Sequence, residues 1–319
     1  MTPNNSADLS SAPSPDFYDA DDSDNVCFLC DNPRYSHLYT ATHFGFPIKF
    51  QKCECGSIKQ TPMPNEKFFE WFFNSEVFFS SKKQEDVDDV DIWGYYDYFA
   101  DESSRLATSK RRYNKLKHHF KPGGRIMKIG PATGTFLHAA ALDGHDVIGC
   151  DVSSRFAQYA RDHYHVKIDN GRFERMGYPE GSFDAVMLLN VVENVPNLPE
   201  FLAAIRKSLK PGGHFVFNYV PMDGNLIAAI QKDKYFIYRP PICYAFTKEA
   251  MIRTAEKYGF RIVESYLDIR YMHLEKMLTL LRLKLPLKIA AALRIHRIPF
   301  PVYAYPSRVL VAEAVDVPE

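Results

Sequence analysis

The chain of 319 residues lacks several features that mark particular classes of protein. Basic and acidic residues both number 39, so the basic excess of a general nucleic-acid binder is missing. No apolar run is as long as a membrane span. No Lys or Arg precedes Arg34, so we expect no signal or transit peptide. Six cysteines are too few for a disulfide scaffold. These absences favour a cytoplasmic protein that does not bind nucleic acid.

A loop of small residues between a strand and a helix is the central feature of the sequence. Residues 125–137 read RIMKIGPATGTFL, an apolar strand, a turn from Gly130 and the start of a helix. Such a turn brings a nucleotide-like ligand against backbone N–H groups. A second strand ends at Asp151, where a carboxylate suits the hydroxyls of a ribose. The dinucleotide pattern G-x-G-x-x-G fits poorly, because Ala132 and Thr135 occupy two of its glycine positions.

Apolar runs and amphipathic segments alternate through the rest of the chain. The pattern predicts helices at residues 103–120, 153–163, 198–209 and 247–258, and strands at residues 166–168, 185–189, 215–220, 260–266 and 309–315. Strands that alternate with helices at this spacing form a parallel sheet with helices on both faces. The sequence therefore predicts an α/β domain.

Several segments resemble class I S-adenosylmethionine-dependent methyltransferases. The G-x-A-x-G spacing from Gly130 is similar to their first motif, and GSFDAVMLLNVVENVPN with FLAAIRKSLKPGGHFVF is similar to their fourth motif and the segment after it. The resemblance covers residues 123–220. It implies a Rossmann-like, doubly wound, mostly parallel seven-stranded sheet, with 309–315 as its antiparallel last strand. It also implies S-adenosylmethionine as the cofactor.

The resemblance assigns cofactor contacts to particular positions. The methionyl and ribose portions would be lined by Gly130, Ala132 and Gly134, and the ribose would be held by Asp151. The adenine would be flanked by Val152 and Phe173, and Asn190 would lie beneath the sulfonium. The acid that opens the family's first motif is Lys128 in this chain. A cation there opposes a ligand with an ammonium and a sulfonium, at a cost of about 2–3 kcal/mol for charges about 6 Å apart at an effective dielectric near 20. Turning Lys128 out to solvent would lessen that cost.

The general base is less clearly indicated. The family branch often has a histidine where this chain has Asn194, and its later histidine is missing from RPPICYAFT. The remaining candidates are Glu193, Tyr219 and Asp223, although the sequence favours a surface or helix-capping acid as the interpretation of Glu193. Two functions stay open. One is methyl transfer to a small or carrier-linked acceptor, such as a sugar or a natural-product or lipid precursor. The other is a non-catalytic relative that keeps the fold as a binding or partner module.

Two pairs of cysteines precede the α/β domain. They are Cys27, Cys30, Cys53 and Cys55. Thiolates paired at both ends of a small hairpin form a tetrahedral structural zinc site, whose metal supplies folding energy. There are two alternatives. His37 or His43 could replace one of the cysteine ligands, or the four cysteines could be ordinary buried residues without a metal. The segments CFLC, KCECG and TPMP resemble the zinc-binding N-terminal module of one branch of the methyltransferase family.

These features divide the chain into successive parts. The parts are a disordered acidic tail (1–25), a zinc-ribbon-like module (26–65), an aromatic-rich helical connector (66–122), and a methyltransferase domain (123–319) with a substrate cover at 221–246 and a basic helical insertion at 271–306. Tyr96 and Tyr98 in the connector are candidate lid residues. The basic residues of 271–298 favour peripheral contact with an anionic membrane, a clamp on a phosphorylated substrate, or a helical pair packed over the sheet.

Overall fold

The structure is a computed structural model. It describes residues 15–19, 26–79, 99, 101–274, 289, 292–293, 295, 297–302 and 307–315. The candidate lid residues Tyr96 and Tyr98 and most of the basic insertion lie outside the described residues. The three interpretations of that insertion therefore remain predictions.

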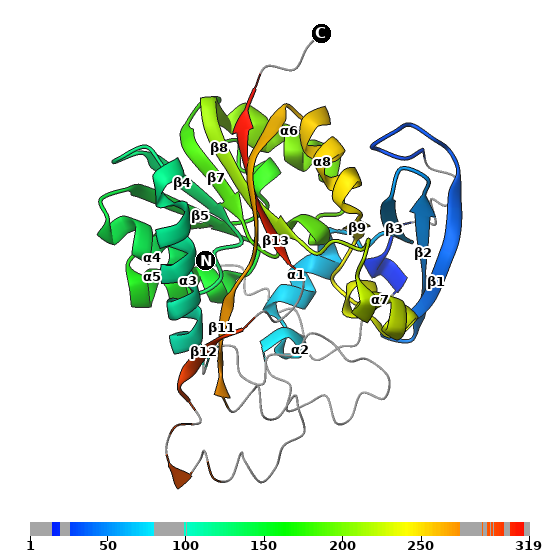
Figure 1. Ribbon diagram of the computed structural model, residues 1–319, viewed down its shortest axis with the longest axis horizontal. Helices are drawn as coiled ribbons and strands as arrows, with labels where there is room; N and C mark the ends of the chain where they lie inside the picture. Colours follow the sequence, from blue (N-terminus) through cyan, green and yellow to red (C-terminus); the bar gives the residue numbers. More distant parts are fainter. Residues whose placement is uncertain are drawn as a thin grey trace, which may run out of the picture.

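A seven-stranded sheet forms the centre of the molecule (Figure 1). Its strands are, in spatial order, β10 (Phe260–Leu267), β13 (Arg308–Ala314), β8 (Leu209–Tyr219), β7 (Phe183–Leu188), β4 (Arg125–Ile129), β5 (Asp146–Asp151) and β6 (Lys167–Asn170). The last five are mutually parallel, and β13 runs antiparallel between β8 and β10. The predicted mostly parallel sheet with an antiparallel final strand is confirmed.

Helices cover both faces of this sheet because its central strands are apolar on both sides. On β7, Ala185 and Met187 pack in the cluster that includes α3 (Glu102–Leu116) and α4 (Thr135–Leu142). Val186 and Leu188 pack in the cluster that includes α6 (Leu198–Ser208) and α8 (Lys248–Lys257). The remaining helix, α5 (Ser154–Tyr164), packs against α4 and β6. The continuous apolar run read from the sequence therefore corresponds to a strand buried on both faces.

Helix starts follow the capping residues of the sequence. The Ser153 hydroxyl accepts a hydrogen bond from the backbone N–H of Phe156, so Ser153 and not Ser154 caps α5. The Thr247 side chain caps α8 in the same way through the N–H of Ala250. Several boundaries differ, most of all the start of β8: it begins at Leu209, whereas the sequence predicted a helix stop and a strand only from 215.

A second, four-stranded sheet follows the order β1 (Tyr35–His43), β2 (Phe46–Cys53), β3 (Ser57–Thr61) and β9 (Tyr244–Phe246). Its fourth strand comes from 221–246, the segment predicted to cover the substrate. Tyr235 and Tyr238 of that segment are buried in one cluster with Ile48 and Phe50. These two tyrosines therefore belong to the core of the N-terminal module. Other residues of the segment, which contains α7 (Leu226–Gln231), line the cavity at the edge of the large sheet, namely Phe236, Pro241 and Ile242, so the cover interpretation stays a prediction.

Residues 15–19 pack on the connector, so the expectation of disorder through residue 25 is wrong for this stretch. The ring centroid of Phe17 lies 5.6 Å from that of Trp71 in α1 (Glu66–Asn74). The N–H of Asn65 donates to the Phe17 carbonyl at 2.9 Å, and the N–H of Asp19 donates to the Met63 carbonyl at 2.8 Å. An aromatic anchor within the acidic segment explains this order, because it buries apolar area.

A short helix and a two-stranded antiparallel sheet are the last of the described elements. They are α2 (Glu76–Phe79) and the two-stranded sheet of β11 (Arg270–His273) with β12 (Pro299–Val302). The segment 271–306 was predicted to be helical, and this is wrong for its two described ends, which pair as strands. In the part of the chain that the structure describes, no helix combines the length and apolar character that a bilayer crossing requires.

Candidate functional site

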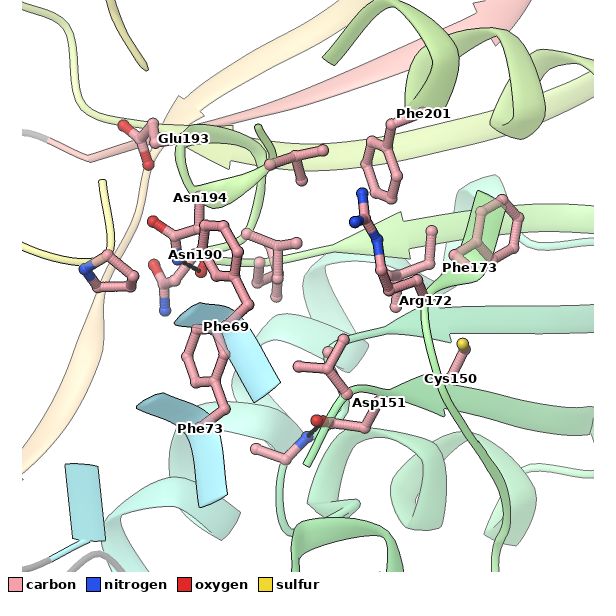
Figure 2. A pocket seen from close by; sticks show the side chains of 18 of the residues that line it. Phe69, Phe73, Cys150, Asp151, Arg172, Phe173, Asn190, Glu193, Asn194 and Phe201 are labelled. Atoms are coloured by element: carbon pink, nitrogen blue, oxygen red, sulfur yellow. Dashed lines mark hydrogen bonds between the residues drawn. The ribbon is translucent and has the colours of Figure 1, made fainter. Parts of the chain in front are cut away.

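A cavity of about 260 Å³ lies at the carboxyl ends of the parallel strands. Each strand end contributes to its lining, namely Gly130 after β4, Asp151 at the end of β5, Gly171 after β6, Asn190 after β7 and Val220 after β8. Figure 2 shows Asn190, Glu193 and Asn194 grouped on one side of this cavity and Cys150, Asp151 and Phe173 on the other. Ligands of open α/β sheets bind at this edge.

The small-residue loop has the backbone that its sequence requires. Gly130 and Ala132 both have positive φ, +60° and +50°. A Cβ at position 130 would lie 2.7 Å from Cγ2 of Val191, so a side chain there would clash as well as strain the turn. The N–H of Ala132 donates to Oδ2 of Asp151 at 3.1 Å, which ties the loop to the end of the neighbouring strand.

The Asp151 carboxylate is fixed and faces the cavity. Besides the Ala132 contact, Oδ1 accepts a hydrogen bond from the N–H of Ser153 at 2.9 Å. Burial raises the pKa of Asp151 to about 6, although these two N–H groups and the charge of Lys128 act in the opposite direction. Each oxygen retains a lone pair beyond these contacts. The carboxylate can therefore accept hydrogen bonds from a ligand diol without rearranging.

Lys128 is buried beneath the loop, with an exposed fraction of 5%. Its Nζ donates to the Gly130 carbonyl at 3.3 Å, and it does not line the cavity. The suggestion that this ammonium turns out to solvent is therefore wrong. Burial and the nearby charge of Arg112 lower the pKa of Lys128 to about 7, against the attraction of Asp151. The ammonium is thus poised to lose its proton near neutral pH.

Six of the eight predicted cofactor positions meet in this cavity. They are Gly130, Ala132, Asp151, Val152, Phe173 and Asn190. Lys128 and Gly134 do not line it. Gly134 precedes α4 with φ +84°, and a Cβ there would lie 2.8 Å from Cβ of Ala160. Gly134 therefore allows the start of α4 to pack closely against α5.

Asn190 is held in a network that includes a residue that the sequence analysis missed. Its N–H donates to Oδ1 of Asn218 at 2.5 Å, while its own Oδ1 accepts from Nδ2 of Asn218 at 2.9 Å. The same Oδ1 accepts from Nη2 of Arg270 at 2.7 Å. Arg270 begins β11 and lines the cavity. It brings a guanidinium to the Asn190 side of the site.

A buried carboxylate fixes that guanidinium. Asp268 accepts from Nε of Arg270 at 3.2 Å and from Nε of Arg112 at 3.0 Å. Burial favours the neutral acid, but the two guanidinium groups outweigh it and hold the pKa of Asp268 below its ordinary value. The single carboxylate of Asp268 thus pairs with two guanidinium groups, so these three side chains together carry a net positive charge.

Glu193 is a buried acid in the cavity wall and not a surface or capping residue. It lies in the turn Val192–Asn194 with an exposed fraction of 5%, and its Oε1 accepts from the N–H of Val220 at 2.8 Å. Burial raises the pKa of Glu193 to about 7, although the Val220 N–H and the charge of Arg270 oppose this. A carboxyl group that titrates near neutral pH can exchange a proton with a bound ligand.

The other two candidate bases lie outside the cavity lining. Tyr219 is buried, and burial raises its pKa to about 12. Asp223 accepts a hydrogen bond from the N–H of Lys248 at 2.6 Å, at the start of α8. The geometry therefore favours Glu193 over these two.

Aromatic side chains from the connector form one wall of the cavity. Phe69 and Phe73 of α1 and Phe78 of α2 line it, and the rings of Phe73 and Phe78 are 5.1 Å apart between centroids. Oδ1 of Asn74 accepts from the N–H of Ser154 at 3.0 Å, which fixes α1 against the chain that follows Asp151. From the sequence these phenylalanines belong to the helical connector, and only Tyr96 and Tyr98 are candidate lid residues. The four-residue spacing of Phe69 and Phe73, which places both on one helix face, was the available signal.

All four cysteines of the N-terminal module meet at one point. The Sγ atoms of Cys27 and Cys55 are 3.7 Å apart, those of Cys30 and Cys53 are 3.5 Å apart, and all four lie within 4.8 Å of one another. Sulfurs around a tetrahedral zinc, each bonded at about 2.3 Å, are separated by roughly 3.8 Å. The C-x-C spacing therefore fits a single ion.

The intervening histidines lie apart from that cluster. Nε2 of His43 is 2.8 Å from the Tyr238 carbonyl, and burial lowers the pKa of His43 to about 4. His37 is likewise not among the described residues that gather around the cysteines.

The chain is similar in sequence to several methyltransferases. It is 32% identical to a demethylmenaquinone methyltransferase of Tropheryma whipplei (strain Twist) over 100 residues, which are 30% of this chain and 41% of that protein. It is 30% identical to a malonyl-[acyl-carrier protein] O-methyltransferase of Erwinia pyrifoliae over 107 residues, 33% of this chain and 41% of that protein. The matched region thus spans about two fifths of the length of these curated relatives.

The chain is also similar to a solved structure and matches a family model. A SAM-dependent methyltransferase from Archaeoglobus fulgidus aligns with 68% of this chain and 100% of its own at a TM-score of 0.48 and 19% identity. The family model described as "Methyltransferase domain" matches residues 98–265, which is more than half of the chain. The sheet order, the cavity at its carboxyl edge and this match agree, and the chain belongs to the methyltransferase-domain family.

Proposed function

We propose that this protein transfers a methyl group from S-adenosylmethionine to a small or carrier-linked acceptor. The observation that carries the proposal is the convergence of six predicted cofactor positions on one cavity, with the fixed Asp151 carboxylate at its edge. When bound, S-adenosylmethionine supplies an electrophilic methyl group. Asp151 would hold the ribose hydroxyls, and Val152 and Phe173 would flank the adenine.

The acceptor would enter on the Asn190 side of the cavity. Glu193 would take the proton of an acceptor hydroxyl there, because its pKa of about 7 allows it to be a carboxylate at neutral pH and a carboxylic acid afterwards. Asn190 would position the reacting atoms, itself held by Asn218 and Arg270. A buried, titratable Glu193 favours a catalytic protein over a non-catalytic relative, although Asn194 stands in the place of a family histidine.

The relatives suggest the class of acceptor. Their names refer to demethylmenaquinone and to malonyl-[acyl-carrier protein], an aromatic quinone and a carrier-linked acid. The phenylalanines of α1 and α2 and the Arg270 guanidinium line the same cavity. Aromatic surface beside a cation suits an aromatic or acyl acceptor that bears oxygen atoms.

We further propose that the four cysteines hold a structural zinc ion. Their sulfur separations fit tetrahedral coordination, and the hydroxyl of Ser57 lies 3.3 Å from Sγ of both Cys27 and Cys55. Such an outer contact orients thiolate ligands. The zinc would join the chain before β1 to the turn after β2 and so stabilise the four-stranded sheet.

Replacing Asp151 with alanine should weaken S-adenosylmethionine binding by about 1–3 kcal/mol, because charged hydrogen bonds to the ribose are lost. Isothermal titration calorimetry measures the dissociation constant. Asp146→Asn is the matched control, since this carboxylate is exposed at the other end of β5 and pairs with Arg125. An unchanged dissociation constant in a folded Asp151→Ala protein would contradict the cofactor assignment.

The zinc proposal predicts close to one zinc ion per purified chain. Cys27→Ser should release it and lower the melting temperature, because the metal-derived folding energy is lost. Elemental analysis and thermal melting measure the two effects. Cys150→Ala is the control, since this buried thiol lies outside the cluster and the variant should keep its zinc. Metal-free wild-type protein with the same melting curve as Cys27→Ser would reject the proposal.

A further inference from the structure

A second group of metal-ligating side chains lies outside the cavity. His118 and His119 belong to the short helix η3 (Lys117–His119) that follows α3, and Glu264 lies on β10. One ligand atom from each of the three lies within 4.8 Å of the other two. None of the three lines the cavity or contributes to the proposed methyl transfer.

The separations are close to those around a metal ion. Nε2 of His119 is 2.7 Å from Oε2 of Glu264, and Nε2 of His118 is 3.6 Å from the same oxygen. Ligands bonded at about 2.0–2.1 Å to a tetrahedral zinc lie roughly 3.3 Å apart. The two separations lie on either side of this value, so modest movements of the side chains would bring each imidazole to the ligand distance from the Glu264 oxygen.

The surroundings limit how such an ion would be bound. Nζ of Lys115 lies 2.9 Å from Oε1 of Glu264, so the carboxylate has only Oε2 to offer. The ring centroid of His214, on β8, is 5.3 Å from that of His119. His214 is not among the three side chains whose ligand atoms gather within 4.8 Å, so water or another small ligand would complete the coordination, and the Lys115 charge would reduce the affinity.

We propose that His118, His119 and Glu264 form a binding site for a divalent transition-metal ion, with Zn²⁺ as the probe. Two imidazoles and one carboxylate suit zinc, nickel or copper and are a poor donor set for magnesium or calcium. His118 is 59% exposed, which gives an ion access from solvent. The exposed position and the neighbouring ammonium place the affinity well below that of the four-cysteine site.

The ion would join two elements that are already linked at one other point. α3 leads into His118 and His119, and β10 carries Glu264. Near the cavity the same two segments are joined by the ion pair of Arg112 with Asp268. A metal would therefore fix them at a second point, and it should raise the melting temperature of the whole domain.

Titration of zinc into the full chain, dialysed beforehand against a weak chelator, tests the site. Wild type should bind one more equivalent, in the micromolar range, than His118→Gln, whose exposed side chain can change without disturbing the core. His163→Gln is the control, because it removes an exposed histidine on α5. The four-cysteine site is present in all three proteins, so zinc bound there does not affect the difference in stoichiometry between them.

Two further results are expected from the donor set. Binding should weaken in acid, because the metal displaces protons from its imidazole ligands. Added zinc should raise the melting temperature of wild type and His163→Gln but not of His118→Gln. Equal stoichiometry in wild type and His118→Gln, or equal loss in His163→Gln, would overturn the site.

Discussion

Glu193→Gln should lower kcat for methyl transfer by about 100-fold or more, because a positioned general base typically contributes about 10²–10⁴ to the rate. The amide keeps the size of the side chain and can still accept from the Val220 N–H, so the fold and the cofactor affinity should be preserved. The assay is formation of S-adenosylhomocysteine with a quinol as acceptor, because a hydroxyl group must lose a proton during the transfer whereas a carboxylate acceptor has none to lose. Glu200→Gln, an exposed change in the first turn of α6, is the matched control.

The pH dependence separates a base from a residue that only shapes the cavity. With its pKa near 7, Glu193 must lose a proton before it can accept one, so wild-type kcat should rise as the pH increases through about 7. Glu193→Gln should lose this rise. A variant with wild-type kcat and an unchanged pH profile would remove Glu193 from the mechanism.

Stability provides a test of Glu193 that needs no acceptor. The pKa rises from 4.5 unfolded to about 7 folded, so the folded state keeps the proton in this window. The free energy of unfolding should therefore fall as the pH increases from 4.5 to 7, and the full cost of the buried charge applies above 7. Glu193→Gln should then be more stable than wild type by about 1–3 kcal/mol at pH 8 and gain little at pH 4.

Lys128→Met should stabilise the protein by about 1–3 kcal/mol at pH 7 and below, because it removes a buried ammonium while keeping an unbranched side chain. The pKa of Lys128 falls from 10.5 to about 7 on folding. Between these values the unfolded state holds the proton and the folded state does not. Wild-type stability should thus rise from pH 7 to 10.5, and the variant should lose this contribution. Urea unfolding at pH 6, 8 and 10 measures it.

The same variant tests the electrostatic cost to the cofactor. Removing a cation near the Gly130 loop should tighten S-adenosylmethionine binding by up to about tenfold, and Lys128→Glu should tighten it more than it tightens uncharged analogues. Lys121→Met, at an exposed position before β4, is the control. Looser binding in both Lys128 variants would show instead that the hydrogen bond from Lys128 to the Gly130 carbonyl holds the loop in shape.

The local sequence determined the sheet and the loop, because both are encoded by neighbouring residues. A continuous apolar run specified β7 as a central strand, and a hydroxyl side chain placed the starts of α5 and α8. The turn after β4 needs small residues for its backbone angles. Asp151 follows from the same reasoning, since a strand end can be read from the chain and its neighbours in a parallel sheet end at the same edge.

Only the tertiary structure decided which distant segments pack in one core and which charged side chains from distant segments lie in contact. The strand β9 joins the cysteine module although almost 200 residues separate it from β3, and no local pattern reveals that partner. Arg270 reaches Asn190 across 80 positions, and Phe69 reaches the cavity from the connector. Burial, too, is a property of the folded chain: it makes Glu193 and Lys128 titrate near neutral pH, because desolvation depends on every segment that packs around a charge.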